Sequence, residues 1–157
     1  MAPLYIFDLD GTLALIDHRR HLVEGDKPNW PAFFAACVDD APNTPVIQTY
    51  LRLAASGADC WVWSGRSDEV REQTEQWLVK NQIFPSRPPG SMPYLNFLKM
   101  RPAGNHTRDE KLKAAWLDAL HPTHKERLVA VFDDRDKVVS MWRSRGVACF
   151  QVAPGAF

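Results

Sequence analysis

The sequence of 157 residues lacks an apolar run long enough to cross a membrane, which would take about 20 consecutive apolar residues. Its first apolar stretch, Leu4–Phe7, is followed at once by Asp8 and Asp10 and is too short for the core of a secretory signal. We therefore expect a cytoplasmic protein with no membrane partner.

Net charge and paired cysteines are also missing. The 19 basic and 19 acidic residues give a formal net charge of +0, so no overall positive field would hold a long nucleic acid, and such a partner would have to be bound locally. Cys37, Cys60 and Cys149 are far apart and contain no CxxC pair, which favours free structural thiols over a disulfide or a zinc site. No GxxxxGK(S/T) pattern of a P-loop kinase occurs.

What the sequence does contain is an alternation of short apolar runs with segments of helical period. This alternation predicts an α/β fold in which parallel strands are joined by crossover helices. With 45% hydrophobic residues, the chain can bury one core but is too short for two ordinary domains, so we expect a single domain over residues 1–157. The expected strands are 4–8, 60–64, 94–100, 128–133 and 147–152.

Four helices are expected between these strands. Thr44 is suited to cap the first, which Gly57 would stop, and Ser67 is suited to cap the second. Thr107 and Glu110 have the spacing of a capping box, so a third helix should begin near residue 108. The last is expected over 135–145. Two stretches break the pattern, 16–43, with a short helix near 31–37, and the proline-rich 84–105, and both resemble insertions near a ligand site.

The strongest chemical signal follows the first strand, where Asp8 and Asp10 are two residues apart and precede Gly11 and Thr12. In an open parallel sheet, ligands bind at the carboxyl ends of the strands. Asp8 can attack phosphorus as a nucleophile, while Asp10 can protonate the leaving oxygen and then deprotonate water. The alternative is an ordinary acidic turn at the end of a strand.

A second pair of acids, Asp133 and Asp134, follows the strand expected at 128–133. Facing Asp8, this pair would supply the oxygen ligands that magnesium prefers, and the metal would offset the repulsion between carboxylates and phosphate. The alternative is that the pair caps the next helix, where acidic side chains are favourable to the helix dipole.

Two further elements lie where a strand gives way to a helix. Ser64, Gly65 and Arg66 can bind phosphoryl oxygens through a hydroxyl, backbone amides and a guanidinium, although a serine-glycine turn before a helix is common. Lys113 can neutralise charge on a phosphorylated intermediate, with Asp109 positioning it. An exposed ion pair between residues four apart on a helix is the simpler explanation of that spacing.

The succession of nucleophile, serine, lysine and acid pair resembles the four motifs of haloacid dehalogenase superfamily phosphatases and covers nearly the whole chain. The resemblance implies a Rossmann-like core with a small or minimal cap, in which the five strands, numbered along the chain, lie in the order 5-4-1-2-3. It implies Mg²⁺ as cofactor. The implied catalytic residues are Asp8, Asp10 and Lys113, the metal ligands Asp8, Asp10, Asp133 and Asp134, and the phosphate-binding residues Thr12, Arg19, Ser64, Gly65, Arg66 and Asp109.

A narrower resemblance is to the 3′-phosphatase domain of phage polynucleotide kinase-phosphatase. It includes the SGR triplet at 64–66, the spacing of Asp109 and Lys113, and the C-terminal run FDDRDKVVSMWRSRGVACFQVAPGAF. That family also carries an arginine after the nucleophile motif, and here Arg19 or Arg20 falls in its place, with Arg19 the better fit by spacing. The segment 18–43 differs from the phage domain, which leaves the substrate less defined than the chemistry.

The function expected from these features is a magnesium-dependent phosphomonoesterase that forms an aspartyl phosphate and removes the 3′-phosphate from nucleic-acid ends or nucleotides. An exposed aromatic residue such as Trp30 or Phe34 would then be suited to stack on a base. One alternative substrate is a free nucleoside monophosphate or another small phosphate ester. An alternative of another class is a binding module that has kept the fold and lost catalysis. No protein partner is implied.

Overall fold

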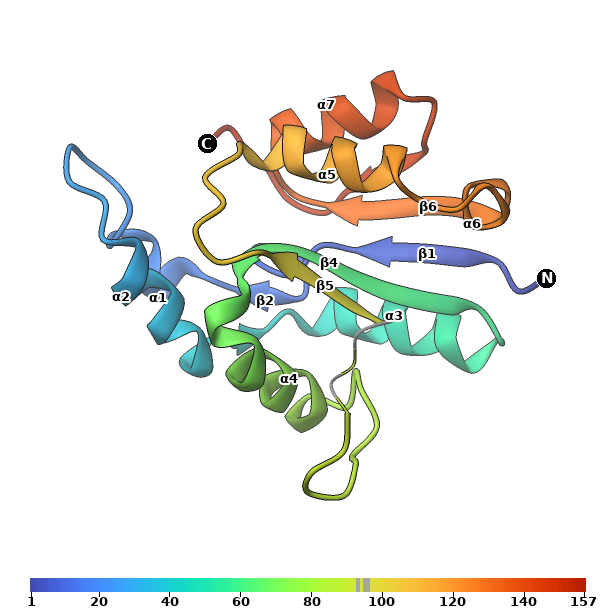
Figure 1. Ribbon diagram of the computed structural model, residues 1–157, viewed down its shortest axis with the longest axis horizontal. Helices are drawn as coiled ribbons and strands as arrows, with labels where there is room; N and C mark the ends of the chain where they lie inside the picture. The colour runs from blue at the N-terminus through green and yellow to red at the C-terminus, as the bar shows by residue number, and fades with distance from the viewer. Residues whose placement is uncertain (93, 95–96) are drawn as a thin grey trace.

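A computed structural model describes residues 1–92, 94 and 97–157 and contains a five-stranded sheet whose neighbouring strands are all parallel. The strands lie in the order β5-β4-β1-β6-β7 (Figure 1). In chain order they are β1 Leu4–Phe7, β4 Asp59–Ser67, β5 Leu98–Arg101, β6 Leu128–Asp133 and β7 Cys149–Gln151. The first expected strand is thus central, flanked by the second and third on one side and the fourth and fifth on the other, as the resemblance implies.

Helices cover both faces of the sheet (Figure 1). Helices α3 (Thr44–Ala55) and α4 (Arg71–Lys80) lie on one face, while α5 (Asp109–Asp118) and α7 (Asp136–Ser144) lie on the other. The short α6 (Pro122–Arg127) leads into β6. Because alternate side chains of a strand point to opposite faces, β1 sends Phe7 into one buried cluster and Ile6 into the other.

The strand expected at 94–100 begins later than the sequence predicts. Residues 95 and 96 lie outside the described residues, and Tyr94 is not in the sheet, because its ring packs against Phe84 at a centroid distance of 4.8 Å. Its carbonyl accepts a hydrogen bond of 2.9 Å from the amide of Leu98. Among the described residues, β5 begins at Leu98. By contrast, β4 extends beyond the expected 60–64, and β7 is shorter than 147–152.

The expected helices are confirmed, but only one of the predicted caps forms as expected. Ser67 accepts a hydrogen bond of 3.3 Å from the amide of Glu69 and starts a 3₁₀ turn, η2 (Asp68–Val70), ahead of α4. Thr44 is inside α3 and Asn43 occupies the cap position, where its side-chain nitrogen donates to the carbonyl of Thr12 (2.8 Å). This bond ties the start of α3 to the loop after β1.

The capping box expected at Thr107 and Glu110 is wrong. Arg108 occupies the cap position of α5 without a side-chain capping bond. The carboxylate of Glu110 pairs with Nε of Arg108 at 2.9 Å. The carbonyl of Thr107 accepts a hydrogen bond from Arg101, and this contact fixes the chain in a path on which the Thr107 side chain does not cap the helix.

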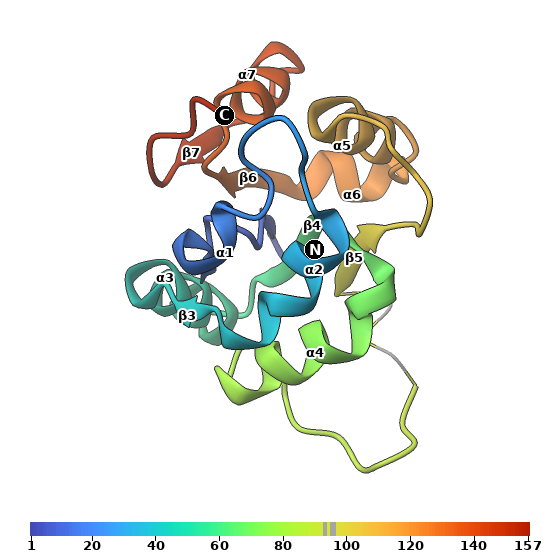
Figure 2. The same ribbon diagram turned by 90° about the vertical axis from the view of Figure 1, so that its left-hand side faces the viewer.

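The expected insertion at 16–43 lies over the carboxyl ends of the strands, and we call this side of the sheet its carboxyl edge. It holds α1 (Asp17–Arg20), α2 (Trp30–Ala35) and the 3₁₀ helix η1 (Ala36–Asp39), and β2 (Ala14–Leu15) pairs antiparallel with β3 (Ala41–Pro42) at its base. The short helix predicted near 31–37 is therefore present. Figure 2, which looks onto this edge, shows α2 in front of the sheet. We call residues 16–43 the cap segment.

Candidate active site

The ends of β1 and β6 bring Asp8 and Asp133 together, and α5 supplies a lysine between them. Lys113 Nζ donates to Asp8 Oδ1 at 2.7 Å and to Asp133 Oδ2 at 2.9 Å. All three side chains are buried. Burial lowers the pKa of Lys113, but the charges of Asp133 and Asp8 outweigh it and raise the pKa overall, so the lysine is cationic. It is therefore a fixed positive charge against the expected nucleophile, not an exposed partner of Asp109.

Asp134 joins this group, so that three buried acids lie close together. Each of Asp8, Asp133 and Asp134 offers an oxygen within 4.8 Å of the others, and this is the acidic group of the described residues that can hold a metal ion. Burial, with the neighbouring carboxylate of Asp133, raises the pKa of Asp8 well above its usual value and that of Asp134 to about 6. Three crowded carboxylates facing one lysine fit a hard divalent cation such as Mg²⁺.

The side chain of Asp10 bonds to two arginines and is not among the three acids of the described residues whose oxygens converge. Arg19 Nη2 donates to Asp10 Oδ1 at 2.9 Å, and Arg66 Nη2 bonds to the same oxygen. Side-chain metal ligation by Asp10, as the sequence suggests, therefore does not fit this arrangement. Burial opposes ionisation of Asp10, yet the charges of Arg66 and Arg19 outweigh it and lower the pKa, so the resting carboxylate is ionised.

The two arginines are themselves held by a buried acid that sequence reasoning missed. Asp40 accepts a bidentate pair from Arg19, Nε to Oδ1 and Nη2 to Oδ2 at 2.7 Å each, and a bond of 3.1 Å from Arg66 Nη2. His18 Nε2 lies 2.8 Å from Oδ1. Asp40 lies in the cap segment outside any short motif, and the adjacent Asp39 is exposed, so no local signal distinguishes it.

The structure also separates the two candidate arginines of the cap segment. Arg19 is fully buried and reaches Asp10. The guanidinium of Arg20 lies over the ring of Phe157, 4.6 Å from its centroid. Arg19 is thus the arginine that faces the expected site.

Gly11 and Gly65 let two loops of the expected site pass close to acidic side chains. Gly11 has φ of +83°, and a Cβ there would lie 2.1 Å from Asp134 Oδ2, so any side chain would displace that carboxylate. A Cβ on Gly65 would lie 2.0 Å from Asp109 Oδ1. Thr12 donates its hydroxyl to Asp8 Oδ2 at 3.2 Å. These contacts place the expected phosphate-binding loop directly beside the acids.

Ser64 lies at the same edge, and Asp109 is used differently from the expectation. The Ser64 side chain is buried, and its Oγ accepts from the amide of Arg66 at 3.1 Å. Asp109 accepts from Arg101 at 2.8 Å and from Arg135 at 3.3 Å instead of pairing with Lys113. Asp109 therefore anchors the loops around the site and acts on Lys113 only through its charge.

The end of the chain supports Asp134 through its backbone. A Cβ on Gly155 would lie 2.0 Å from the Asp134 carbonyl oxygen, and the Gly155 carbonyl accepts from the amide of Asp136 at 2.8 Å. Gln151 Nε2 donates to the Asp134 carbonyl at 3.0 Å. This packing gives a physical reason for the specific C-terminal run seen in the sequence.

Comparison with known proteins agrees with this geometry. A family model described as the polynucleotide kinase PNKP phosphatase domain matches residues 2–157. The chain belongs to this family. As a PNKP phosphatase domain it is a phosphatase of the haloacid dehalogenase superfamily.

Solved structures similar to this PNKP phosphatase domain include a chain of the Pnkp1/Rnl/Hen1 RNA repair complex. That chain is 30% identical with a TM-score of 0.78, and the match covers 99% of the present chain but 44% of the other. A further structure of the Pnkp1/Rnl/Hen1 complex has the same score and identity, with 48% of its chain covered. The present sequence thus spans less than half the length of these two chains.

A more distant match is the class C acid phosphatase from Bacillus anthracis, which is 13% identical with a TM-score of 0.62. The match covers 99% of the present chain and 67% of the acid phosphatase chain. At this identity the match supports the fold alone. No helix of the described residues is long and apolar enough to cross a membrane.

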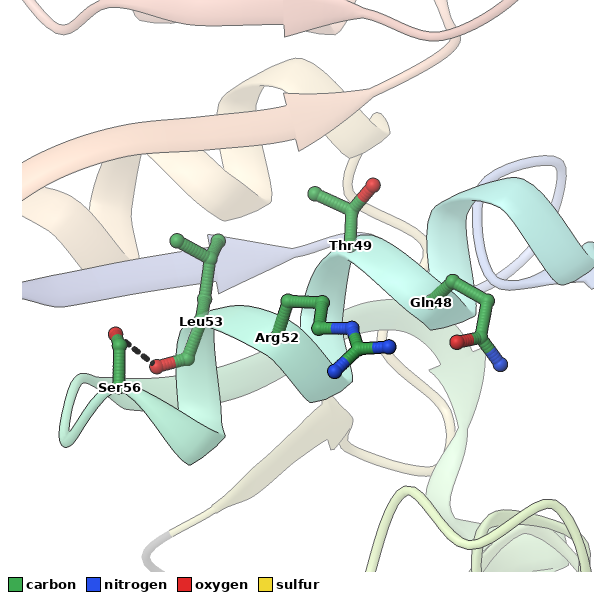
Figure 3. A pocket seen from close by; sticks show the side chains of 5 residues that line it. All are labelled: Gln48, Thr49, Arg52, Leu53 and Ser56. Atoms are coloured by element: carbon green, nitrogen blue, oxygen red, sulfur yellow. Dashed lines mark hydrogen bonds between the residues drawn. The ribbon is translucent and has the colours of Figure 1, made fainter.

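A shallow depression lies apart from the site of this PNKP phosphatase domain, on the outer surface of α3 (Figure 3). It is lined by Gln48, Thr49, Arg52, Leu53 and Ser56. It contains no acid and none of the expected site residues, so it is not part of the expected site.

Proposed function

We propose that the protein is a magnesium-dependent phosphomonoesterase that removes the 3′-phosphate from nucleic-acid ends through an aspartyl phosphate on Asp8. The observation that carries the proposal is the contact of Lys113 with both Asp8 and Asp133, beside Asp134. A nucleophilic carboxylate, a fixed cation and two further oxygen ligands share one buried site. This set is what transfer of a phosphoryl group to a carboxylate requires.

In the first step, an Asp8 oxygen attacks phosphorus and the bond between phosphorus and the 3′-oxygen breaks. The leaving oxygen takes a proton from Asp10, so that the nucleic acid departs with a free hydroxyl. Asp10 must first be protonated, whereas Arg19 and Arg66 hold it ionised in the resting protein. A substrate phosphate bound by these two arginines would draw them from the carboxylate and make proton uptake easier.

In the second step, water attacks phosphorus and the bond between phosphorus and Asp8 breaks. Asp10, now a carboxylate, takes the proton of that water, and inorganic phosphate leaves. Lys113 balances negative charge on the Asp8 side throughout, because it is buried against this residue. Both steps conserve atoms: Asp8 ends as a free carboxylate, and Asp10 ends protonated, as it was when the first step began. Asp10 returns to its resting ionised form by releasing that proton once phosphate has left the arginines.

The residues that would hold Mg²⁺ are Asp8, Asp133 and Asp134, whose oxygens converge. When bound, the ion would supply positive charge that favours the ionised form of the nucleophile and neutralises the phosphate oxygens. The raised pKa values of Asp8 and Asp134 are the electrostatic reason why a cation is needed there.

The polynucleotide end is favoured as substrate by the family, since the chain is a PNKP phosphatase domain and resembles a chain of an RNA repair complex. Free nucleoside monophosphates or another small phosphate ester are the alternative, and the balanced charge of the chain is compatible with them. Loss of catalysis is disfavoured because the expected catalytic residues Asp8, Asp10 and Lys113 are all present, together with Asp133 and Asp134.

Release of inorganic phosphate tests the proposal. The substrates are a 3′-phosphorylated oligonucleotide, a 3′-mononucleotide and a 5′-mononucleotide, each with magnesium and with a chelator, and Asp8→Asn is the control. The proposal expects the highest kcat/KM with the oligonucleotide and no release by Asp8→Asn or with chelator. A preference for a mononucleotide would indicate that the substrate is a free nucleotide and not a nucleic-acid end. Full activity of Asp8→Asn would overturn the mechanism.

A further inference from the structure

We propose that Trp30 is a specificity-determining residue whose indole stacks on the nucleobase next to the 3′-phosphate. The inference rests on the proposed function and names how that site distinguishes a nucleotide end from other phosphate esters. Trp30 is 49% exposed, although large aromatic side chains are usually mostly buried.

The cap segment has two aromatic candidates, and the structure separates them. Phe34 is partly buried and packs against the core cluster that contains Phe7 and Leu78, so its ring already has a packing role. Trp30 belongs to neither buried cluster. Its indole is thus available to a ligand, whereas the ring of Phe34 is not.

Trp30 is close to the proposed phosphate site through a short chain of contacts. Its ring lies 5.6 Å from the ring of Phe33, and the guanidinium of Arg19 lies 4.2 Å from the centroid of that same Phe33 ring. Arg19 Nη2 is 2.9 Å from Asp10. Only two side chains therefore separate the exposed indole from the group expected to protonate the leaving oxygen.

The indole is also held in place, which a stacking platform needs. Phe33 meets it at an interplanar angle of 87° and Phe34 at 31°, with centroids 5.6 and 5.9 Å away. The helix under it is fixed at its start, since Asn29 Oδ1 accepts from the amide of Ala32 at 3.1 Å. Figure 2 shows α2, which begins with Trp30, in front of the sheet on the side where the strands end. Stacking on a fixed ring recovers binding energy without ordering a mobile side chain.

The chemistry of this platform fits a base and not a backbone phosphate. An indole offers a π face, which every nucleobase can stack on regardless of sequence. The charged groups that would hold phosphate, Arg19 and Arg66, are separate and buried. Phosphate recognition and base recognition are thus assigned to different residues, and they can be tested independently.

The test compares two substrates that differ only in the terminal base. One is a 3′-phosphorylated oligonucleotide, and the other is the same oligonucleotide with an abasic sugar carrying the 3′-phosphate. The readout is the ratio of their kcat/KM values. We expect the wild-type protein to prefer the complete substrate by about tenfold, Trp30→Ala to lose that preference through a higher KM, and Trp30→Phe to keep most of it.

The control is Phe150→Ala, which removes another exposed aromatic side chain (58% exposed) far from the cap segment in sequence; its ratio should equal that of the wild type. An unchanged ratio in Trp30→Ala, or an equal loss on both substrates, would overturn the stacking role while leaving the phosphatase proposal intact. A wild-type protein that releases no phosphate from either oligonucleotide would overturn both.

Discussion

Buried charges at the carboxyl ends of the strands form two groups, one in which Lys113 contacts Asp8 and Asp133 and one in which Asp40 contacts two arginines. Asp8 and Asp133 directly end or follow apolar strands, so their place follows from the topology of a parallel sheet. Asp40 does not follow a strand of this sheet. Its role depends on contacts with Arg19 and Arg66, which are distant from it in the chain. Only the folded cap segment brings these partners together.

Replacing Lys113 with methionine should damage both activity and stability. The change removes the cation from two buried carboxylates, and breaking a buried ion pair typically costs about 3–5 kcal/mol. We expect kcat to fall about a hundredfold or more, as on removal of one group that stabilises transition-state charge. Phosphate release and chemical unfolding of the metal-free protein are the measurements.

The matched control is Lys111→Met, two residues away on the exposed face of α5, which should leave both quantities close to wild type. Equal effects of the two substitutions would show that the loss comes from the helix and not from the buried contacts.

The pKa of Asp134, raised to about 6 mainly by burial and by Asp133, predicts a pH-dependent cost. Below the unfolded value of 3.8 the carboxyl is protonated in both states and costs nothing. Between 3.8 and about 6 the unfolded carboxyl ionises while the folded one stays protonated, so the cost builds up over this range. It reaches the order of 2–3 kcal/mol and is fully present at pH 8. Asp134→Asn should therefore stabilise the metal-free protein at pH 8 but hardly at pH 4.

Thermal unfolding at the two pH values, with and without magnesium, checks this. Wild type should gain stability from magnesium at pH 8, and Asp134→Asn should gain much less. The exposed Asp136→Asn should show neither the pH pattern nor the loss of the metal effect. Lower stability of metal-free Asp134→Asn than of wild type at pH 8 would refute the assigned cost.

At the scale of elements, the sequence predicts the existence of helices and strands better than their ends. Periodicity identifies α3 and α7 because their apolar residues recur on one face. Ends depend on tertiary contacts, such as the turn at Tyr94 that precedes β5 or the contact of Arg101 with the Thr107 carbonyl. These partners are set by the fold, so a local pattern cannot identify them.

Two of the predicted caps, Ser67 and Thr107, should differ in their contribution to stability. Ser67→Ala removes a side chain that accepts from the Glu69 amide, and loss of such a cap costs about 1 kcal/mol. Thr107→Ala removes a side chain that does not cap α5, so the free energy of unfolding should change by only a few tenths of a kcal/mol, about the usual size for a surface position. Denaturant unfolding of both variants compares them, and an equal cost would mean that the capping box does form in solution.

At the scale of the whole molecule, one sheet separates two buried clusters and carries the site at one edge. Residues of β1 contribute to both clusters, so we propose that residues 1–157 fold as one domain, with the cap segment placed over the strand ends (Figure 2). The order of strands follows from the family resemblance, whereas the path of the cap segment does not. It depends on contacts such as those of Asp40 with Arg19 and Arg66, which no local pattern in the sequence identifies.

The central claim is that Asp8 carries the phosphoryl group during turnover. The most direct test is to mix the protein with magnesium and an oligonucleotide labelled in its 3′-phosphate, to quench with acid during turnover, and to locate the label by peptide analysis. The account predicts label on the peptide that contains Asp8, and none in Asp8→Asn. Label on another residue, or rapid phosphate release with no labelled protein and undiminished activity of Asp8→Asn, would contradict it.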